Sequence, residues 1–185
     1  KRVDTPGILT PKIEDQEKVV FFWNNRNARR KQSGSLLFWF DEFANEVGRD
    51  KVRLIMHTDP NDIHGQPLQH IIEKLGNDGT MMISNAKVPP QVLSDMYNMA
   101  ACTLNISDAE GFGLATLESL SCETPIVVTM TGGLQEQVYC HENRTWHGIG
   151  IQPDSKAIIG SLSVPYIYED RVDKGQFHSA LTKIY

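Results

Sequence analysis

Short apolar runs that alternate with turns and amphipathic stretches constrain the fold of this chain more than any other feature. Five runs have the length and residue types of buried strands: 19–23, 52–56, 81–83, 103–106 and 126–129. Each run is followed by a turn or by apolar residues at helical spacing. This repeated order predicts an α/β domain with a Rossmann-like, doubly wound parallel sheet and a ligand at the carboxyl ends of its strands. Weaker strand patterns follow at 148–151 and 164–168.

Two carboxylates flank a glycine turn after the run 103–106. Glu110 immediately precedes the turn, and Glu118 follows after seven intervening residues. Helical spacing places Glu118 beside an apolar stripe. The stripe consists of Leu114, Leu117 and Ser121. A carboxylate there needs a partner, and a pair of ribose hydroxyls would serve, because an ionised carboxylate accepts two hydrogen bonds at once. The alternative is a half-exposed glutamate paired with a lysine or an arginine.

The glycine turn itself favours an anion. Gly111 and Gly113 let the backbone approach a ligand closely, and we expect a helix to begin near Phe112. The first amides of a helix lack internal partners and lie at its positive dipole end. The amides from Gly111 to Leu114 are therefore candidates for binding a phosphate.

A basic turn follows the first strand and precedes an amphipathic helix. Its cations are Arg26, Arg29, Arg30 and Lys31. The helix dipole disfavours cations at a helix N-terminus, so an anion shared by these groups would explain the cluster. A solvated basic turn is the alternative. A third polar segment, the loop 85–90, contains Lys87 and Val88 and leads into another helix through two prolines.

The run from Glu110 to Glu136 contains E-G-F-G-L, a second glutamate after seven residues, then C-x-T-P before an apolar run, and finally G-G-x-x-E. This contiguous pattern resembles the retaining GT-B glycosyltransferases of the GT4-like group, the glycosyl transferases group 1. The resemblance covers roughly residues 19 to 138. At three positions where the family usually has glycine, this chain has Asn25, Gln32 and Glu123.

The resemblance implies the C-terminal half of a GT-B fold, with an interdomain connector over residues 1–18 and a donor-binding domain over 19–185. The implied reaction moves a sugar from a nucleotide-diphosphate sugar to an acceptor with retention of anomeric configuration. The acceptor, a glycan or lipid, would be held by an absent N-terminal domain. The chain alone would then be inactive or nearly so.

The resemblance also implies residue roles. Arg26 and Lys31 would grip the donor diphosphate, and Glu110 would contact the transferred sugar. Glu118 would bind the ribose, and the segment around Lys87 and Val88 would recognise the base. The implied substrate-binding amides are those of Gly111, Phe112, Gly113 and Leu114.

Composition excludes other classes of function. A formal net charge of −5 and a pI near 5.7 argue against nucleic acid as a partner. Three cysteines without C-x-x-C spacing predict free thiols in a reducing, cytoplasmic compartment. The histidines lack the spacing of a metal site, so neither a metal nor a cofactor is expected. No stretch approaches the roughly 20 apolar residues needed to cross a membrane, so any membrane contact would be peripheral, through the absent half.

Three alternatives remain open. A sugar-nucleotide epimerase shares the two-domain fold and differs in its product. A non-catalytic nucleotide-sugar sensor would bind the donor without transferring it. A Rossmann oxidoreductase is disfavoured because no G-x-G-x-x-G follows the first strand.

Overall fold

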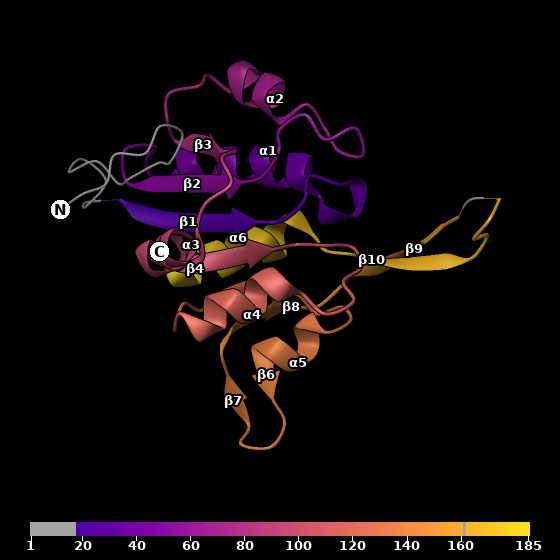
Figure 1. The fold of residues 1–185 in the computed structure, drawn as a ribbon. Coiled ribbons are helices and arrows are strands. Elements are labelled where there is room, and N and C mark those ends of the chain that lie inside the picture. The colour runs from indigo at the N-terminus through magenta and orange to yellow at the C-terminus, as the bar shows by residue number, and fades with distance from the viewer. Residues whose placement is uncertain (1–17, 161) are drawn as a thin grey trace.

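A six-stranded parallel sheet forms the centre of the molecule (Figure 1). This computed structural model describes residues 18–160 and 162–185. The strands are β1 (Val19–Asn24), β2 (Val52–His57), β3 (Met81–Ser84), β4 (Cys102–Asn105), β5 (Ile126–Thr129) and β8 (Gly148–Ile151). Their order is β3-β2-β1-β4-β5-β8, and every neighbouring pair is parallel. The predicted Rossmann-like, doubly wound sheet is confirmed, including its sixth strand at 148–151.

Helices cover both faces of the sheet. One face carries α1 (Ser33–Val47), α2 (Leu68–Lys74) and α6 (Lys174–Ile184), and the other carries α3 (Pro90–Met99), α4 (Leu114–Ser121) and α5 (Leu134–Val138). Alternation along β1 explains the two layers, because successive side chains of a strand point to opposite faces. Phe21 and Trp23 pack with α1, whereas Val20 and Phe22 pack with α3. All four side chains are buried.

The chain reverses its direction across the sheet between β1 and β4. After β1 it builds outward to β2 and β3, then returns so that β4 pairs with β1 on the other side. Phe21 faces Cys102 and Phe22 faces Thr103 in this pairing. The turn after β1 and the loop after β4 therefore meet at the carboxyl edge of the sheet, although almost 80 residues separate the two strands. Crevices at such switch points are the usual ligand sites of open α/β sheets.

Helix α4 differs from the prediction in two respects. It begins at Leu114 rather than near Phe112, because Gly113 adopts a φ of 86° and stands at the N-cap. The predicted apolar stripe is also wrong as a buried face, since Leu114 and Leu117 are 68% and 40% exposed. Small polar residues pack α4 inward instead: the Ser119 hydroxyl donates to Thr103 Oγ1 at 2.8 Å.

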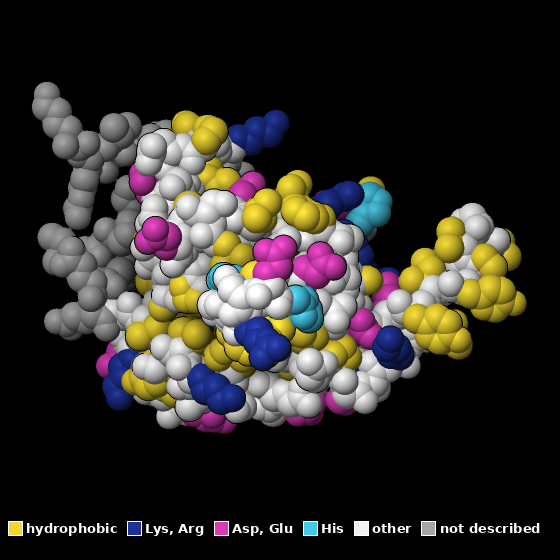
Figure 2. Space-filling view, turned by 90° about the horizontal axis from the view of Figure 1, so that it is seen from below, with side chains coloured by type: hydrophobic (Ala, Val, Ile, Leu, Met, Phe, Trp, Pro, Cys, Tyr) yellow, Lys and Arg dark blue, Asp and Glu magenta, His cyan; other side chains and the backbone are white. Residues whose placement is uncertain are grey.

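The last third of the chain adds two antiparallel hairpins. A small one joins β6 (Tyr139–Cys140) to β7 (Thr145–Trp146). A longer one, β9 (Ser155–Ile159) with β10 (Ile167–Arg171), projects from the side where the sheet strands end (Figure 1). The strand predicted at 164–168 is thus displaced to 167–171, because Pro165 has no N–H for a ladder and lies in the turn. Figure 2 shows apolar side chains along this projecting hairpin. The exposed apolar residues of this segment include Ile158, Tyr166 and Tyr168.

The predicted connector at residues 1–18 lies, apart from Lys18, outside the described residues. The boundary of the donor-binding domain at residue 19 therefore stays a prediction. Helix α6 closes the described fold by packing Phe177 and Leu181 into the core beside α1.

The turn that contains Gly132, after β5, packs closely against the loop that contains Glu110, after β4. A Cβ atom on Gly132 would clash with the carbonyl oxygen of Glu110, and the φ of Gly132 is 49°. We expect Gly132→Ala to lower the free energy of unfolding by about 1–3 kcal/mol, because the added methyl group overpacks this contact. Urea denaturation of the 185-residue chain measures it.

Gly111→Ala is the matched control, since a Cβ there meets nothing within 4 Å. Its stability should stay within about 0.5 kcal/mol of wild type. Equal stability of the two variants would contradict the close approach.

Candidate functional site

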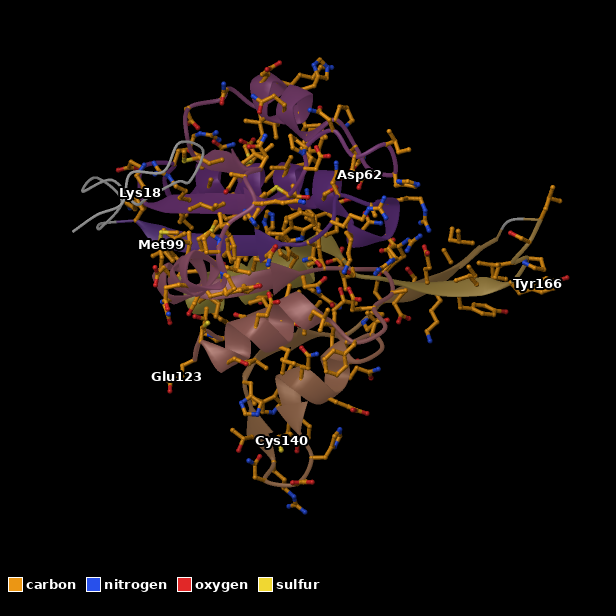
Figure 3. All side chains as sticks on the ribbon, in the orientation of Figure 1. Lys18, Asp62, Met99, Glu123, Cys140 and Tyr166 are labelled. Carbon is orange, nitrogen blue, oxygen red and sulfur yellow. The ribbon has the colours of Figure 1, made fainter. Side chains whose placement is uncertain are left out.

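The predicted site residues gather mainly at the carboxyl edge of the sheet. Figure 3 shows Asp62, in the loop after β2, on the same side of the molecule as the hairpin tip at Tyr166. Met99 and Glu123 lie on the opposite side. The departure from the family pattern at Glu123 therefore falls away from the site. It adopts a φ of 59°, the left-handed conformation that explains why the family usually has glycine there.

A buried ion pair joins the turn after β1 to the loop after β4. Lys31 ends the 3₁₀ turn η2 (Arg29–Lys31) and is only 6% exposed. Its ammonium group pairs with Glu110 Oε2 and donates a hydrogen bond to Asn25 Oδ1 at 2.8 Å. Arg30 adds a hydrogen bond to the carbonyl oxygen of Ala109 at 2.6 Å and lies 3.4 Å from Glu110 Oε2. A diphosphate-binding lysine and a sugar-contacting glutamate, as predicted, would thus be direct neighbours.

The surroundings shift the pKa of both partners. Burial lowers the pKa of Lys31, and the hydrogen bond from Lys31 to Glu110 opposes this shift. Burial acts to raise the pKa of Glu110, but the hydrogen bond from Lys31 and the charges of Lys31 and Arg30 together hold it below its ordinary value. Glu110 is therefore an ionised carboxylate at neutral pH, and its charge stabilises the buried ammonium group.

The two departures from glycine in the basic turn have structural roles. Gln32 adopts a φ of 53°, a left-handed conformation that disfavours side chains by about 1–2 kcal/mol. Its side chain offsets this cost by donating to Asp108 Oδ2 at 2.6 Å and accepting from Ser35 Oγ at 2.7 Å. Asn25 holds Lys31. The turn thus keeps its shape by side-chain hydrogen bonds.

Every cation of the basic turn has a carboxylate partner. Arg26 pairs with Asp62 at 2.6 Å and also contacts His64 Nδ1 at 2.7 Å. Arg29 binds Glu169 through two hydrogen bonds of 2.8 and 2.6 Å. The cluster therefore does not need a shared anion to exist. Sequence reasoning missed these acidic partners because they lie 36 to 140 residues away along the chain.

Arg26 and Lys31 differ in their partners and in their exposure. The Arg26 side chain is 62% exposed and turns toward the loop after β2, where it strongly lowers the pKa of Asp62. Lys31 is buried against Glu110. The structure thus brings Lys31 to the glycine turn and directs Arg26 to its rim.

The N-terminus of α4 is open toward the same edge. Within the described residues, no side chain caps this helix, whose N-cap is Gly113. The carbonyl groups of Phe112 and Gly113 instead accept hydrogen bonds from Gln137 and Thr116. Gly111 and Phe112 are exposed. The amide end of the helix dipole can therefore reach a ligand without displacing a protein side chain.

The protein partners of Glu118 are a tyrosine and an asparagine rather than the lysine or arginine of one alternative. Its Oε2 accepts a hydrogen bond of 2.8 Å from the Tyr97 hydroxyl, and Asn24 Nδ2 lies 3.5 Å away. Asn24 also donates to the Tyr97 hydroxyl at 2.8 Å. No lysine or arginine pairs with Glu118 within residues 18–160 and 162–185. Burial is the main cause that raises the pKa of Tyr97, so the phenol stays protonated and orients the carboxylate.

The two predicted site residues in the loop after β3 differ in their burial. Lys87 is exposed, whereas Val88 packs against the cluster that contains Phe22 and Tyr97. Val88 therefore belongs to the same cluster as Tyr97, which donates a hydrogen bond to Glu118, whereas the Lys87 side chain is exposed to solvent.

Several polar atoms near the strand ends lack partners. The side chains of Asn25, Thr58, Asn105 and Thr129 each hold a buried N or O atom without a hydrogen bond to the described residues. They follow or end β1, β2, β4 and β5. Because buried polar groups normally have partners, this edge is suited to a polar ligand or to ordered water. His57 is not among them, since it bonds Ser84 Oγ at 3.0 Å.

Metal ligands do not cluster in the part of the chain that the structure describes. Its helices include none long and apolar enough to cross a membrane. Cys102, Cys122 and Cys140 are free thiols, as predicted.

An open cleft of about 750 Å³ lies elsewhere, between α4, α5 and the β6–β7 hairpin. Leu117, Glu136 and Trp146 line it, but none of the predicted site residues does. We place the candidate site at the carboxyl edge, because the buried pair, the open helix end and the unpartnered polar atoms meet there.

The fold defines a Rossmann-like α/β domain, and the N-terminus of α4 opens at its carboxyl edge. The profile of the family "Glycosyl transferases group 1" matches residues 44–159, more than half of the chain. The chain belongs to this family, as the sequence motifs predict.

Individual relatives are similar over shorter stretches. A D-inositol 3-phosphate glycosyltransferase of Acidothermus cellulolyticus is 43% identical over 51 residues, which cover 28% of this chain and 11% of the relative. The sucrose-phosphate synthase structure from Thermosynechococcus elongatus matches with a TM-score of 0.66 at 18% identity, over 91% of this chain and 36% of that one. An E. coli trehalose-6-phosphate structure bound with UDP-2-fluoro glucose matches with a TM-score of 0.62 at 13% identity, over 92% and 37%. The chain thus spans about a tenth of the curated relative and little more than a third of the solved structures.

Replacing the buried lysine tests the ion pair. In Lys31→Met, Glu110 keeps its burial but loses its main partner, so we expect a loss of about 1–3 kcal/mol in unfolding free energy near neutral pH. In wild type, the lowered pKa of Glu110 contributes stability that is present above its unfolded pKa and lost as the pH falls through the folded pKa. The gap between the two proteins should therefore be nearly constant close to pH 7 and shrink as the pH falls from about 5 to about 3.

Urea midpoints across this pH range measure the gap. Lys87→Met, at an exposed lysine, is the control and should show no such gap. A constant gap for Lys31→Met would mean that lost packing, not charge, causes its effect.

Proposed function

We propose that this chain is the donor-binding domain of a retaining glycosyltransferase, which takes a sugar from a nucleotide-diphosphate sugar. The family match supports sugar transfer, and the two glutamates around the glycine turn support the donor role. One observation carries the proposal: the Lys31–Glu110 pair lies directly before the open N-terminus of α4, at the switch point of the sheet.

The charges at this point suit a diphosphate. A lysine ammonium group has three hydrogens, and Asn25 and Glu110 take two of them. The third can donate to a phosphate oxygen. The amides between Gly111 and Leu114 add the positive end of the helix dipole. These groups would stabilise the negative charge that develops on the nucleoside diphosphate as it leaves, which is electrostatic catalysis.

Glu110 can serve the sugar while it holds Lys31. Only its Oε2 is engaged by Lys31 and Arg30. Its other oxygen has no recorded partner in residues 18–160 and 162–185, so it can accept a hydrogen bond from a sugar hydroxyl. The carboxylate thus positions the donor sugar beside its own leaving group.

Glu118, like Glu110, has one carboxylate oxygen held by the protein and another that can accept a hydrogen bond from a ligand, here a ribose. Tyr97 and Asn24 orient its Oε2, and its other oxygen can accept from a ribose hydroxyl. The apolar surface around Val88 would lie against the base. Arg26 would join the diphosphate site from the rim after release from Asp62.

The acceptor, a glycan or lipid, would be held by a second domain. The chain's share of the solved structures, about 36%, motivates this part of the proposal. The E. coli structure mentioned above is bound with a nucleotide sugar, which supports the donor class proposed here. The proposed compartment is the cytoplasm, where nucleotide sugars and free thiols would coexist, and no metal or other cofactor is needed for the proposed chemistry.

The direct experiment is a thermal-shift panel with UDP-, GDP- and ADP-sugars. A donor at 100 times its dissociation constant should stabilise the chain by about 2.7 kcal/mol. Incubation with labelled donor should then give little transfer or hydrolysis by the chain alone, because a closed cleft needs a second domain. Absence of a shift with every donor would contradict the proposal, and an epimerised donor would identify an epimerase instead.

Glu118→Gln tests the ribose role. The variant should lose affinity for the preferred nucleoside diphosphate by roughly tenfold to a hundredfold, because a hydrogen bond to a charged group contributes about 1.5–3 kcal/mol. It should lose much less affinity for the 2′,3′-dideoxy analogue, which lacks that contact from the start. Calorimetric titration measures both. An equal loss for both ligands would make Glu118 a structural residue.

A further inference from the structure

The base of the β9–β10 hairpin is bonded to the two loops that form the proposed donor site. Arg29, in the turn after β1, binds the Glu169 carboxylate on β10 through both of its terminal nitrogens, at 2.8 and 2.6 Å. Arg171, two residues further along β10, pairs with Asp108 in the loop after β4 at 2.7 Å. Glu169 and Asp108 are 3% and 2% exposed, so both carboxylates are charges held inside the protein.

The four residues form one connected network. Arg171 lies 3.3 Å from Glu169 Oε2, and Gln32 donates to Asp108 Oδ2 at 2.6 Å. Two backbone hydrogen bonds of 2.8 Å run alongside: Asp108 N donates to Arg30 O, and Asp170 N donates to Asp108 O. The basic turn, the Glu110 loop and β10 are thus joined at Asp108, two residues before Glu110.

Only one face of the hairpin takes part. Glu169 and Arg171 share a face of β10, because residues two apart on a strand point to the same side. Asp170, between them, points to the other face and pairs with Lys156 of β9 at 3.5 Å. The hairpin therefore carries two sets of ion pairs, of which one holds the donor loops and the other holds only the hairpin itself.

We propose that Glu169 and Arg171 are positioning residues for diphosphate binding: through Arg29 and Asp108 they hold the Lys31 turn and the Glu110 loop in register. This inference rests on the proposed donor-binding function. The hairpin lies outside the strands and helices of the six-stranded sheet, so the site is completed by a segment beyond the Rossmann-like core. Buried carboxylates with fixed hydrogen bonds suit this role, because leaving one unpaired is costly.

The test compares nucleotides that differ by one phosphate. Affinities of the wild-type chain are measured by calorimetry for UDP against UMP, GDP against GMP and ADP against AMP. The wild type should prefer the diphosphate for at least one base. Glu169→Gln should reduce that preference by about threefold to thirtyfold, the range found for substitutions along coupled networks. Binding of the monophosphate, through the base and ribose, should change little.

Lys156→Ala is the matched control, because it breaks the ion pair on the other face of the same hairpin. It should leave the diphosphate preference unchanged. If Glu169→Gln does not fold, Arg29→Lys keeps the positive charge but loses the two-pronged contact and should show the same reduced preference.

Two failures are distinguishable. If wild type binds none of the six nucleotides, the proposed donor-binding function fails. If wild type prefers a diphosphate and both Glu169→Gln and Arg29→Lys keep that preference, or Lys156→Ala loses it equally, the positioning role is overturned while the donor site stands.

Discussion

The pairing of β1 with β4 is the constraint on which the rest of the structure depends. Because these strands are neighbours in the sheet but lie far apart in the chain, their following loops must meet at the carboxyl edge. Lys31 and Glu110 can then form a buried pair, and the N-terminus of α4 comes to the same place. The chemistry proposed for the site follows from this meeting of two loops rather than from any residue alone.

Side-chain hydrogen bonds and ion pairs help to fix these loops. The left-handed conformation of Gln32 is strained for a residue with a side chain, and its bonds to Asp108 and Ser35 stabilise it. Burying Asp108 raises the pKa of its carboxyl group, and the contacts from Gln32 and Arg171 oppose that shift. Burial of such charges is a weak source of stability but an effective source of specific geometry in some proteins, which is what a ligand site requires.

Local patterns predict the strands well because strand length and alternation are encoded over a few residues. The apolar runs at 19–23 and 126–129 appear within one residue of their predicted ends. Long-range partners leave no local signal, so the acids that pair with Arg26 and Arg29 were missed. The stripe on α4 was wrong for another reason: Leu114 has the right spacing for a core residue, but its side chain is 68% exposed. The strand predicted at 164–168 begins at Ile167 instead, because Pro165 has no N–H for the ladder.

Hydrogen–deuterium exchange with bound nucleoside diphosphate tests the central claim most directly, since it reports which backbone amides the ligand covers. UDP, GDP and ADP are the ligands, and peptides across the whole chain are followed with and without each. The account predicts slower exchange in the presence of the preferred ligand at residues 110–116 and 26–32, with no change at 139–147 beside the open cleft. Protection at 139–147 instead, with 110–116 unchanged, would place the ligand in that cleft and contradict the account.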